Sequence, residues 1–303
     1  MSTTREIRRH MRSVRNIAQV TRAMQMVAAS KMRRAQDQVL ATRPYAHKAW
    51  ELLTHLAGQV SQGEDQLHPI LKVRPVKTIG LVVITSDKGL CGGYNHSMLR
   101  RVLEFLGEQN KPVKVITVGR KGRDFLLRTK VDLVAEFTAI PAMPSFIDLL
   151  PVARTVLDDY YAGLYDEVVL GYTEFVNTLI QRPVIRGLLP IVPAGGAEAQ
   201  ATGQHLYAGP PPKIPEYIYE PDPQTVLAEI LPRFTELQIY QAVLESAASE
   251  HSARMVAMRN ATENAKDLLD HLTLSFNRAR QSAITKEMLD IAGGAEALAR
   301  ARA

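Results

Sequence analysis

The sequence has a single cysteine, Cys91, in 303 residues. One thiol cannot form an internal disulfide and is too few for a structural zinc site. The chain also lacks the uninterrupted run of about 18 apolar residues that a membrane-spanning helix needs. Its start, MSTTREIRRHM, has no apolar segment of the kind found in secretory signals. We therefore expect an intracellular chain that folds in a reducing compartment and does not cross a bilayer.

Proline and glycine are absent from two long stretches, residues 1–43 and 233–292. Because both residues interrupt regular structure, their absence predicts two long helices. Each stretch carries apolar or small residues at alternating steps of three and four, the seam of a coiled coil. The seam positions are Ile7, Met11, Val14, Ala18, Thr21, Gln25, Ala28, Met32, Ala35 and Val39, then Leu237, Tyr240, Leu244, Ala247, His251, Arg254, Met258, Ala261, Ala265, Leu268 and Leu272. A helix of 60 residues would reach roughly 90 Å, so part of it must project from a compact globule, and antiparallel pairing of the two ends is the natural arrangement.

The middle of the chain alternates between two patterns. Short β-branched runs at 78–87, 113–119, 131–137 and 166–175 are typical of buried strands, and helical periodicity lies between them at 96–109, 121–129 and 145–162. This alternation predicts an α/β class with an open, mainly parallel, Rossmann-like sheet. The predicted domains are a discontinuous coiled coil, 1–60 plus 222–303, and a central α/β domain, 75–221. The segment 193–215 has no apolar periodicity and is expected to be a mobile connection.

The net charge of +6 conceals a strong asymmetry, because residues 1–43 hold ten Lys or Arg against Glu6 and Asp37. A basic block of this kind indicates an anionic partner such as nucleic acid, lipid headgroups or acidic protein. A solvated helix face explains the charge equally well. Aromatic residues for base stacking are absent before Tyr45, which argues against nucleic acid.

The sharpest local motif is SDKGLCGGYN, residues 86–95, which follows a predicted strand and precedes a predicted helix. Phosphate often binds at such a place in α/β proteins. A phosphate loop of the NTPase type ends in Gly-Lys-Ser/Thr, however, and Gly92-Gly93-Tyr94 supplies neither amine nor a small hydroxyl residue. The pattern favours a structural glycine turn, with Cys91 as a small packing residue, over a nucleotide site. The turn residues singled out are Asp87, Gly89, Cys91, Gly92, Gly93 and Asn95.

The eight histidines are scattered and have no zinc-ligand spacing, so we expect neither a metal nor a cofactor. His251 on the second seam is interpreted as a packed or hydrogen-bonded core residue. No nucleophile elbow or other reaction motif is visible. From the residues alone, two classes of function stay open: a basic adaptor that binds nucleic acid or anionic membrane, and a free-standing NTPase that uses the 86–95 turn.

Three motifs resemble one known family. The opening carries a basic helix, AMQMVAASK and a closing RPY; the turn reads TSDKGLCGGYN; and the end reads SFNRARQSAITKEMLDIAGGAEAL. All three are similar to signatures of the gamma subunit family of F-type ATP synthases, in the same order and across the whole chain. The short end, 295–303, extends a little past the signature, and the inserted cysteine pair of the redox-regulated chloroplast form is missing.

The resemblance implies a noncatalytic rotor shaft that couples ion flow through a membrane ring to ATP synthesis or hydrolysis at the beta subunits. Its implied partners are the alpha and beta subunits of the catalytic ring, the epsilon subunit and the ring of c subunits, with no nucleic acid. The implied location is peripheral, on the cytoplasmic face of a bacterial cell membrane. The resemblance also implies beta-subunit contacts: Arg22, Met24 and Lys31 near an acidic lever segment, and Arg254, Gln281, Thr285 and Glu287 near a catch loop. Gln281 and Thr285 could equally belong to a plain solvated helix face.

Overall fold

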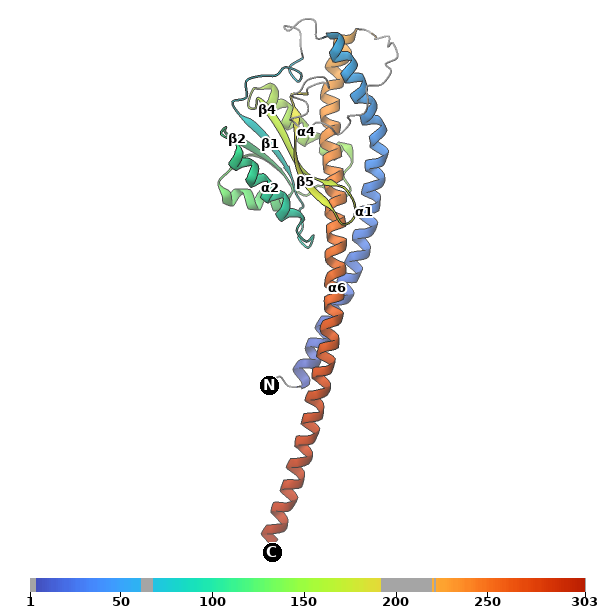
Figure 1. The fold of residues 1–303 in the computed structure, drawn as a ribbon, viewed down its shortest axis with the longest axis vertical. Coiled ribbons are helices and arrows are strands. Elements are labelled where there is room, and N and C mark those ends of the chain that lie inside the picture. Colours follow the sequence, from blue (N-terminus) through green and yellow to red (C-terminus); the bar gives the residue numbers. More distant parts are fainter. Residues whose placement is uncertain (1–3, 61–67, 192–219, 221, 303) are drawn as a thin grey trace. The chain divides into compact units, whose positions relative to one another are not determined.

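The computed structural model describes residues 4–60, 68–191, 220 and 222–302 (Figure 1). Its elements in chain order are α1 (Thr4–Val60), β1 (Ile79–Ile84), α2 (Tyr94–Glu108), β2 (Val113–Val118), α3 (Arg120–Leu126), η2 (Leu127–Thr129), β3 (Asp132–Phe137), α4 (Phe146–Tyr161), β4 (Glu167–Phe175), β5 (Gln181–Leu189) and α6 (Pro223–Arg302). The chain divides into two compact units, unit 1 with residues 1–27 and 255–303, and unit 2 with residues 28–254. Both long helices continue from one unit into the other. The domain boundaries predicted near 60 and 222 stay a prediction.

The predicted seam of the first helix is confirmed residue by residue. All ten of its seam positions are buried or half-buried, and most of the positions between them are exposed. The seam of α6 is likewise shielded from Leu237 to Ala265, and only Leu268 on it is exposed. Because the apolar stripe returns every three or four residues, each helix buries one face against the other.

Unit 1 is an antiparallel pair of helical segments, 4–27 of α1 and 255–302 of α6. The Thr21 and Thr262 hydroxyls hydrogen-bond at 2.8 Å, and the Arg8 guanidinium lies 5.2 Å from the centre of the Phe276 ring. The two residue numbers of each pair add to 283 or 284, as an antiparallel pairing at constant register requires. In that register Thr4, the first described residue of α1, lies opposite residue 280 of α6. Every described residue of α6 from 281 to 293 is exposed.

Unit 2 contains a five-stranded sheet of order β3-β2-β1-β4-β5. The β1–β2, β1–β4 and β2–β3 pairs are parallel, as predicted, and β4–β5 is antiparallel. All six residues of the central strand β1 are buried, because helices cover both faces of the sheet. On one face the core includes Val82, Ile84 and Leu170 with α4, α1 and the first part of α6. On the other face Leu81 and Val83 pack against α2 and α3.

The helical segments of unit 2 pack on the sheet and on each other. The rings of Trp50 in α1 and Phe234 in α6 stack with centroids 5.6 Å apart, and their residue numbers again add to 284. Buried residues of α6 from Leu227 to Leu244 belong to the same core as the sheet. In Figure 1 this part of α6 runs alongside the strands. Within unit 2, α6 therefore serves as a core helix of the α/β domain as well as a partner of α1.

Two features of the elements differ from the sequence expectations. Strand β5 was missed because Pro183 and Gly187 weaken its strand pattern; proline is tolerated there because β5 is an edge strand. Both long helices also run through residues that usually end a helix, with Pro44 inside α1 and Pro232 inside α6. The expected mobile connection at 193–215 lies outside the described residues.

Gly119, between β2 and α3, provides a test of how tightly the carboxyl edge of the sheet is packed. It adopts φ +105°, and a Cβ there would lie 2.2 Å from the backbone oxygen of Thr85. We predict that Gly119→Ala lowers the free energy of unfolding by about 3 kcal/mol or more, through backbone strain and this clash. The measurement is urea unfolding of the isolated chain.

The matched control is Gly107→Ala near the end of α2, where an added Cβ meets nothing within 4 Å. Alanine should raise stability there by about 0.5 kcal/mol, because it restricts the unfolded chain. Equal effects of the two substitutions would contradict the packing described at Gly119.

Candidate functional site

The turn at 86–95 satisfies its own polar groups. The amide side chain of Asn95 donates to the Ser86 hydroxyl at 2.7 Å and to the Cys91 sulfur at 3.2 Å, while its oxygen accepts the Ser86 backbone N–H at 3.0 Å. Leu90 and Gly92 both adopt positive φ, which folds the chain back on itself. Cys91 is 2% exposed, in agreement with its interpretation as a packing residue.

Asp87 fastens this turn to the next strand–helix connection, because its carboxylate accepts the backbone N–H of Arg120 at 2.9 Å. Gly89 lies on the side of the turn that faces α6, where its carbonyl accepts a bond from Arg254. Gly93 is the N-cap of α2 without a side-chain cap. The predicted turn residues therefore do come together, and their hydrogen bonds are the bonds of a folded turn.

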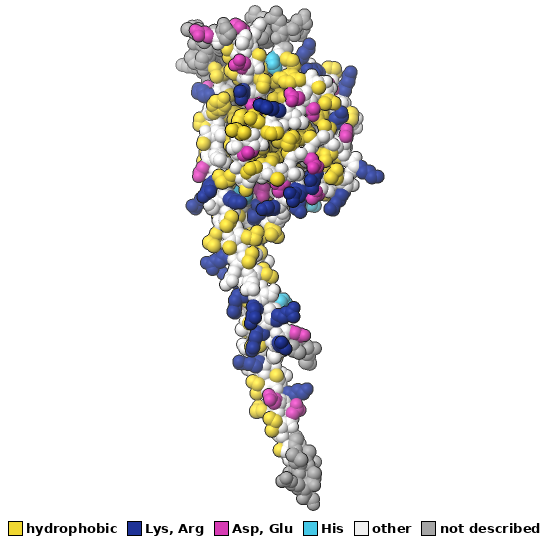
Figure 2. All heavy atoms as spheres, turned by 180° about the vertical axis from the view of Figure 1, so that it is seen from behind, with side chains coloured by type: hydrophobic (Ala, Val, Ile, Leu, Met, Phe, Trp, Pro, Cys, Tyr) yellow, Lys and Arg dark blue, Asp and Glu magenta, His cyan; other side chains and the backbone are white. Residues whose placement is uncertain are grey.

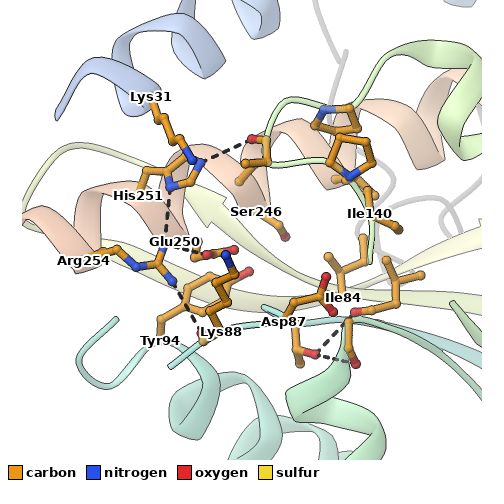
Figure 3. Close-up of a pocket in the computed structure, with 18 residues that line it drawn as sticks. Lys31, Ile84, Asp87, Lys88, Tyr94, Ile140, Ser246, Glu250, His251 and Arg254 are labelled. Carbon is orange, nitrogen blue, oxygen red and sulfur yellow. Dashed lines mark hydrogen bonds and ion pairs between the residues drawn. The ribbon is translucent and has the colours of Figure 1, made fainter. Parts of the chain in front are cut away.

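A cavity of about 190 Å³ lies at the carboxyl ends of β1 and β2, closed by α6 (Figure 3). This edge of an open α/β sheet is where ligands commonly bind. Here helix α6 occupies much of that edge and contributes part of the cavity lining. Charged and polar side chains in the lining are Lys31, Asp87, Lys88, Tyr94, Ser246, Glu250, His251 and Arg254. Among the described residues, no cluster of His, Cys, Asp or Glu could hold a metal ion.

Arg254 is the centre of the polar contacts around this cavity. Its guanidinium donates to Glu250 at 2.6 Å and to the backbone oxygens of Lys88 and Gly89 at 3.4 and 3.2 Å. The side chains of Arg254 and Glu250 are only 12% and 20% exposed. An ion pair this shielded is stabilised by further hydrogen bonds to its charged groups, which the two backbone oxygens supply.

His251 is 4% exposed, and its Nε2 hydrogen-bonds the Ala142 backbone oxygen at 3.3 Å. This confirms its interpretation as a hydrogen-bonded core residue. Burial lowers the pKa of His251 below 6.5; the Glu250 carboxylate opposes that shift, while Arg254 and Lys31 add to it. Burial likewise raises the pKa of Cys91 and of Tyr94. Burial therefore favours the neutral forms of these three groups at neutral pH.

The remaining predicted contact residues lie on the surfaces of the long helices. Arg22 is exposed on α1, and Met24 is half-buried beside it. Gln281, Thr285 and Glu287 are exposed on α6. In the register of unit 1, Arg22 lies opposite residue 261, about 30 Å along the helix axis from Gln281. The structure therefore places these residues in two separate surface patches.

Five basic residues of the first helix are exposed and form no ion pair among the described residues. Among the described residues, no ion pair forms at Arg5, Arg9, Arg12, Arg15 or Arg22. All five are exposed, and Figure 2 shows Lys and Arg side chains gathered along the helical pair. Exposed like charges on one element repel one another.

Comparison with known proteins identifies the family. A family model described as ATP synthase matches residues 3–298. The chain belongs to the ATP synthase gamma chain family. It is 50% identical over 299 residues to the ATP synthase gamma chain of Dehalococcoides mccartyi strain CBDB1, covering 99% of this chain and 100% of that one. To the gamma chain of Roseiflexus castenholzii it is 51% identical over 304 residues, covering 99% of both.

Solved structures agree with this family. The chain resembles a chain of the central stalk and c-ring structure of Tetrahymena thermophila mitochondrial ATP synthase, with TM-score 0.57, 28% identity, and coverage of 80% of this chain and 99% of that one. A chain of the Euglena gracilis mitochondrial enzyme shares the fold, with TM-score 0.64, 20% identity, and coverage of 97% and 94%. As a gamma chain, this protein is the central rotor stalk of an ATP synthase.

Sequence reasoning missed most of the polar contacts of α6. The spacing of Glu250 and Arg254 is a readable signal, because residues four apart share a helix face. The contacts of Ser246, Ser249 and Ser252 with distant backbone atoms left no such signal, since their partners are set by the fold.

The lowered pKa of His251 predicts a pH dependence of stability. Between the folded pKa and about 6.5 the unfolded chain binds more protons, so stability falls as the pH drops through that interval. We expect His251→Gln to lose less stability than the wild type between about pH 7 and pH 5.5, measured by urea unfolding.

Exposed His96 provides the control, because His96→Gln changes no buried group. An NMR titration would report the His251 midpoint directly. A midpoint at or above 6.5, with the same pH profile for the wild type and His251→Gln, would contradict the burial argument.

Proposed function

We propose that the chain works as a noncatalytic shaft whose helical pair bears on the alpha and beta subunits of the catalytic ring. Its α/β domain would contact the epsilon subunit and the ring of c subunits. The whole would lie peripherally on the cytoplasmic face of a bacterial membrane. No described helix is long and apolar enough to cross a membrane, which fits a peripheral subunit. The observation that carries the proposal is the antiparallel helical pair with a buried seam and an exposed basic surface.

The physical role of such a shaft is to distinguish conformations of its housing. A binding partner shifts a conformational equilibrium only by its difference in affinity for the two states. A shaft with different side chains on each face offers each beta subunit a different contact as it turns. Catalytic groups are then needed only on the housing, which suits a chain whose polar turn residues bond one another.

Two surface patches are proposed to make these contacts. Arg22, Met24 and Lys31 would contact an acidic segment of the beta subunit. Opposite charges would orient the shaft there without fixing it in one position, because water partly screens them. Gln281, Thr285 and Glu287 would make the second contact, from an exposed stretch of α6 that has no described partner helix. Arg254, 27 positions before Gln281 in the sequence, is proposed as a further beta-subunit contact, although most of its donors bond within the chain.

A reconstitution experiment tests the shaft. The chain is assembled with three alpha and three beta subunits, a bead is attached to its α/β domain, and rotation is followed during ATP hydrolysis. We expect stepwise rotation in one direction, and loss of that rotation when residues 281–303 and the first helix are both removed. Failure of the full chain to enter the ring, together with salt-sensitive DNA binding, would instead support a basic adaptor.

Charge removal at the first patch gives a finer prediction. In the assembled complex, Arg22→Gln combined with Lys31→Gln should reduce the ions transported per ATP by roughly two- to fivefold, the scale of one partly screened charge pair. The effect should shrink at high salt. Coupling is measured as ion uptake into vesicles divided by ATP hydrolysed.

The control is Lys114→Gln on strand β2, which removes one positive charge from the α/β domain. An equal loss of coupling in the control, or none in the double variant at low salt, would overturn the assignment of the first patch.

A further inference from the structure

Helix α6 is both polar and deeply buried over one short stretch. Ser246 is 2% exposed, and Ser249 and Ser252 are 0% exposed. Three buried hydroxyls on one helix need partners, because an unpaired polar group in a protein interior is costly. Their partners all lie in the α/β domain.

The first partners are the backbone groups of Thr173 on strand β4. Strand β1 pairs with β4 only as far as Gly171, so the backbone of β4 two residues later has no neighbour from β1. There Ser246 Oγ accepts the Thr173 N–H at 3.2 Å, and Ser249 Oγ donates to the Thr173 oxygen at 3.1 Å. The helix thus replaces the missing strand for one residue.

The second set of partners lies in the connection between β4 and β5. Ser252 Oγ donates to the Thr178 oxygen at 2.8 Å and accepts from Gln181 Nε2 at 3.4 Å. The turn that joins the two antiparallel strands is therefore attached to α6, six residues beyond Ser246.

The third set of hydrogen-bond partners lies in the loops that follow β1 and β3, at the carboxyl edge of the sheet. Arg254, oriented by Glu250, holds the backbone oxygens of Lys88 and Gly89, and His251 holds that of Ala142. Figure 3 shows these side chains projecting from α6 toward the connections that follow the strands. Ser246, Ser249, Glu250, His251, Ser252 and Arg254 form what we name the polar joint.

We propose that the polar joint locks the rotational register of α6 on the α/β domain, so that torque passes between them without slip. Apolar contacts of α6 from Leu227 to Leu244 hold the helix on the sheet, but burial of apolar area is non-directional and tolerates sliding. Hydrogen bonds have narrow limits of distance and angle. A helix that rotated or slid at the joint would break all of its bonds together.

This role differs from contact with another subunit. The hydroxyls of Ser249 and Ser252 are fully buried, so no partner chain can reach them. Their loss changes the connection between helix and domain alone, which makes them the decisive positions for a test.

The test uses the complete ATP synthase with Ser249→Ala and Ser252→Ala combined, and separately with Glu250→Gln, which removes the ion pair at Arg254. A bead on the α/β domain reports the angular variance of the rotor during catalytic pauses, and vesicles report ions transported per ATP. We expect the angular variance to rise roughly twofold and the ions per ATP to fall, while ATP hydrolysis stays near the wild-type rate, because directional bonds are lost and the catalytic sites are not touched. A general structural defect would lower hydrolysis as well.

Glu263→Gln is the matched control, since Glu263 and Arg259 form the same i,i+4 ion pair on α6 but are 55% and 68% exposed. Hydrogen exchange gives an independent readout: Ser246→Ala should speed exchange of the Thr173 amide about fivefold, the factor for one lost hydrogen bond. Unchanged angular variance in the assembled serine and Glu250→Gln variants would overturn the proposal, as would an equal rise in Glu263→Gln. If the double serine variant does not assemble, Ser252→Ala alone replaces it. The wild-type complex tests the rotor assignment separately: if it rotates, an unchanged variant contradicts only the role of the polar joint.

Discussion

The structure depends on a fixed antiparallel register between α1 and α6. In both units the paired residues of the two helices add to nearly the same number, from Arg8 with Phe276 to Trp50 with Phe234. A seam with steps of three and four residues can keep that register only if no residue is inserted on either side. Within each unit, the segment of α1 and the segment of α6 are thereby held in one register.

Much of this fold could be predicted from the sequence, because local residue patterns determine its elements. The seam residues repeat at helical spacing, and the four parallel or central strands are short β-branched runs such as 113–119. Strand β5 could not be predicted from the sequence, because Pro183 and Gly187 weaken its strand pattern. Its pairing with β4 defines it as a strand. Its edge position is a property of the assembled sheet, which no local window contains.

The site was predictable to a different extent. The turn at 86–95 was correctly located, because glycine spacing and its place after a strand are local features, and Cys91 proved to be a packing residue. The polar joint was not foreseen. Ser249 bonds Thr173, 76 positions earlier in the chain, and serines within an alanine-rich helix give no sign of such distant partners. Long-range hydrogen bonds of side chains to backbone become visible only when the topology is known.

The stretch of α6 from residue 281 to 293 has a consequence of its own. It is fully exposed, it lies beyond the described end of α1, and it displays apolar side chains at Ile284, Met288, Leu289 and Ile291. Exposed apolar side chains gain free energy when another surface covers them. This end of α6 is therefore a part of the chain that assembly with a partner would stabilise.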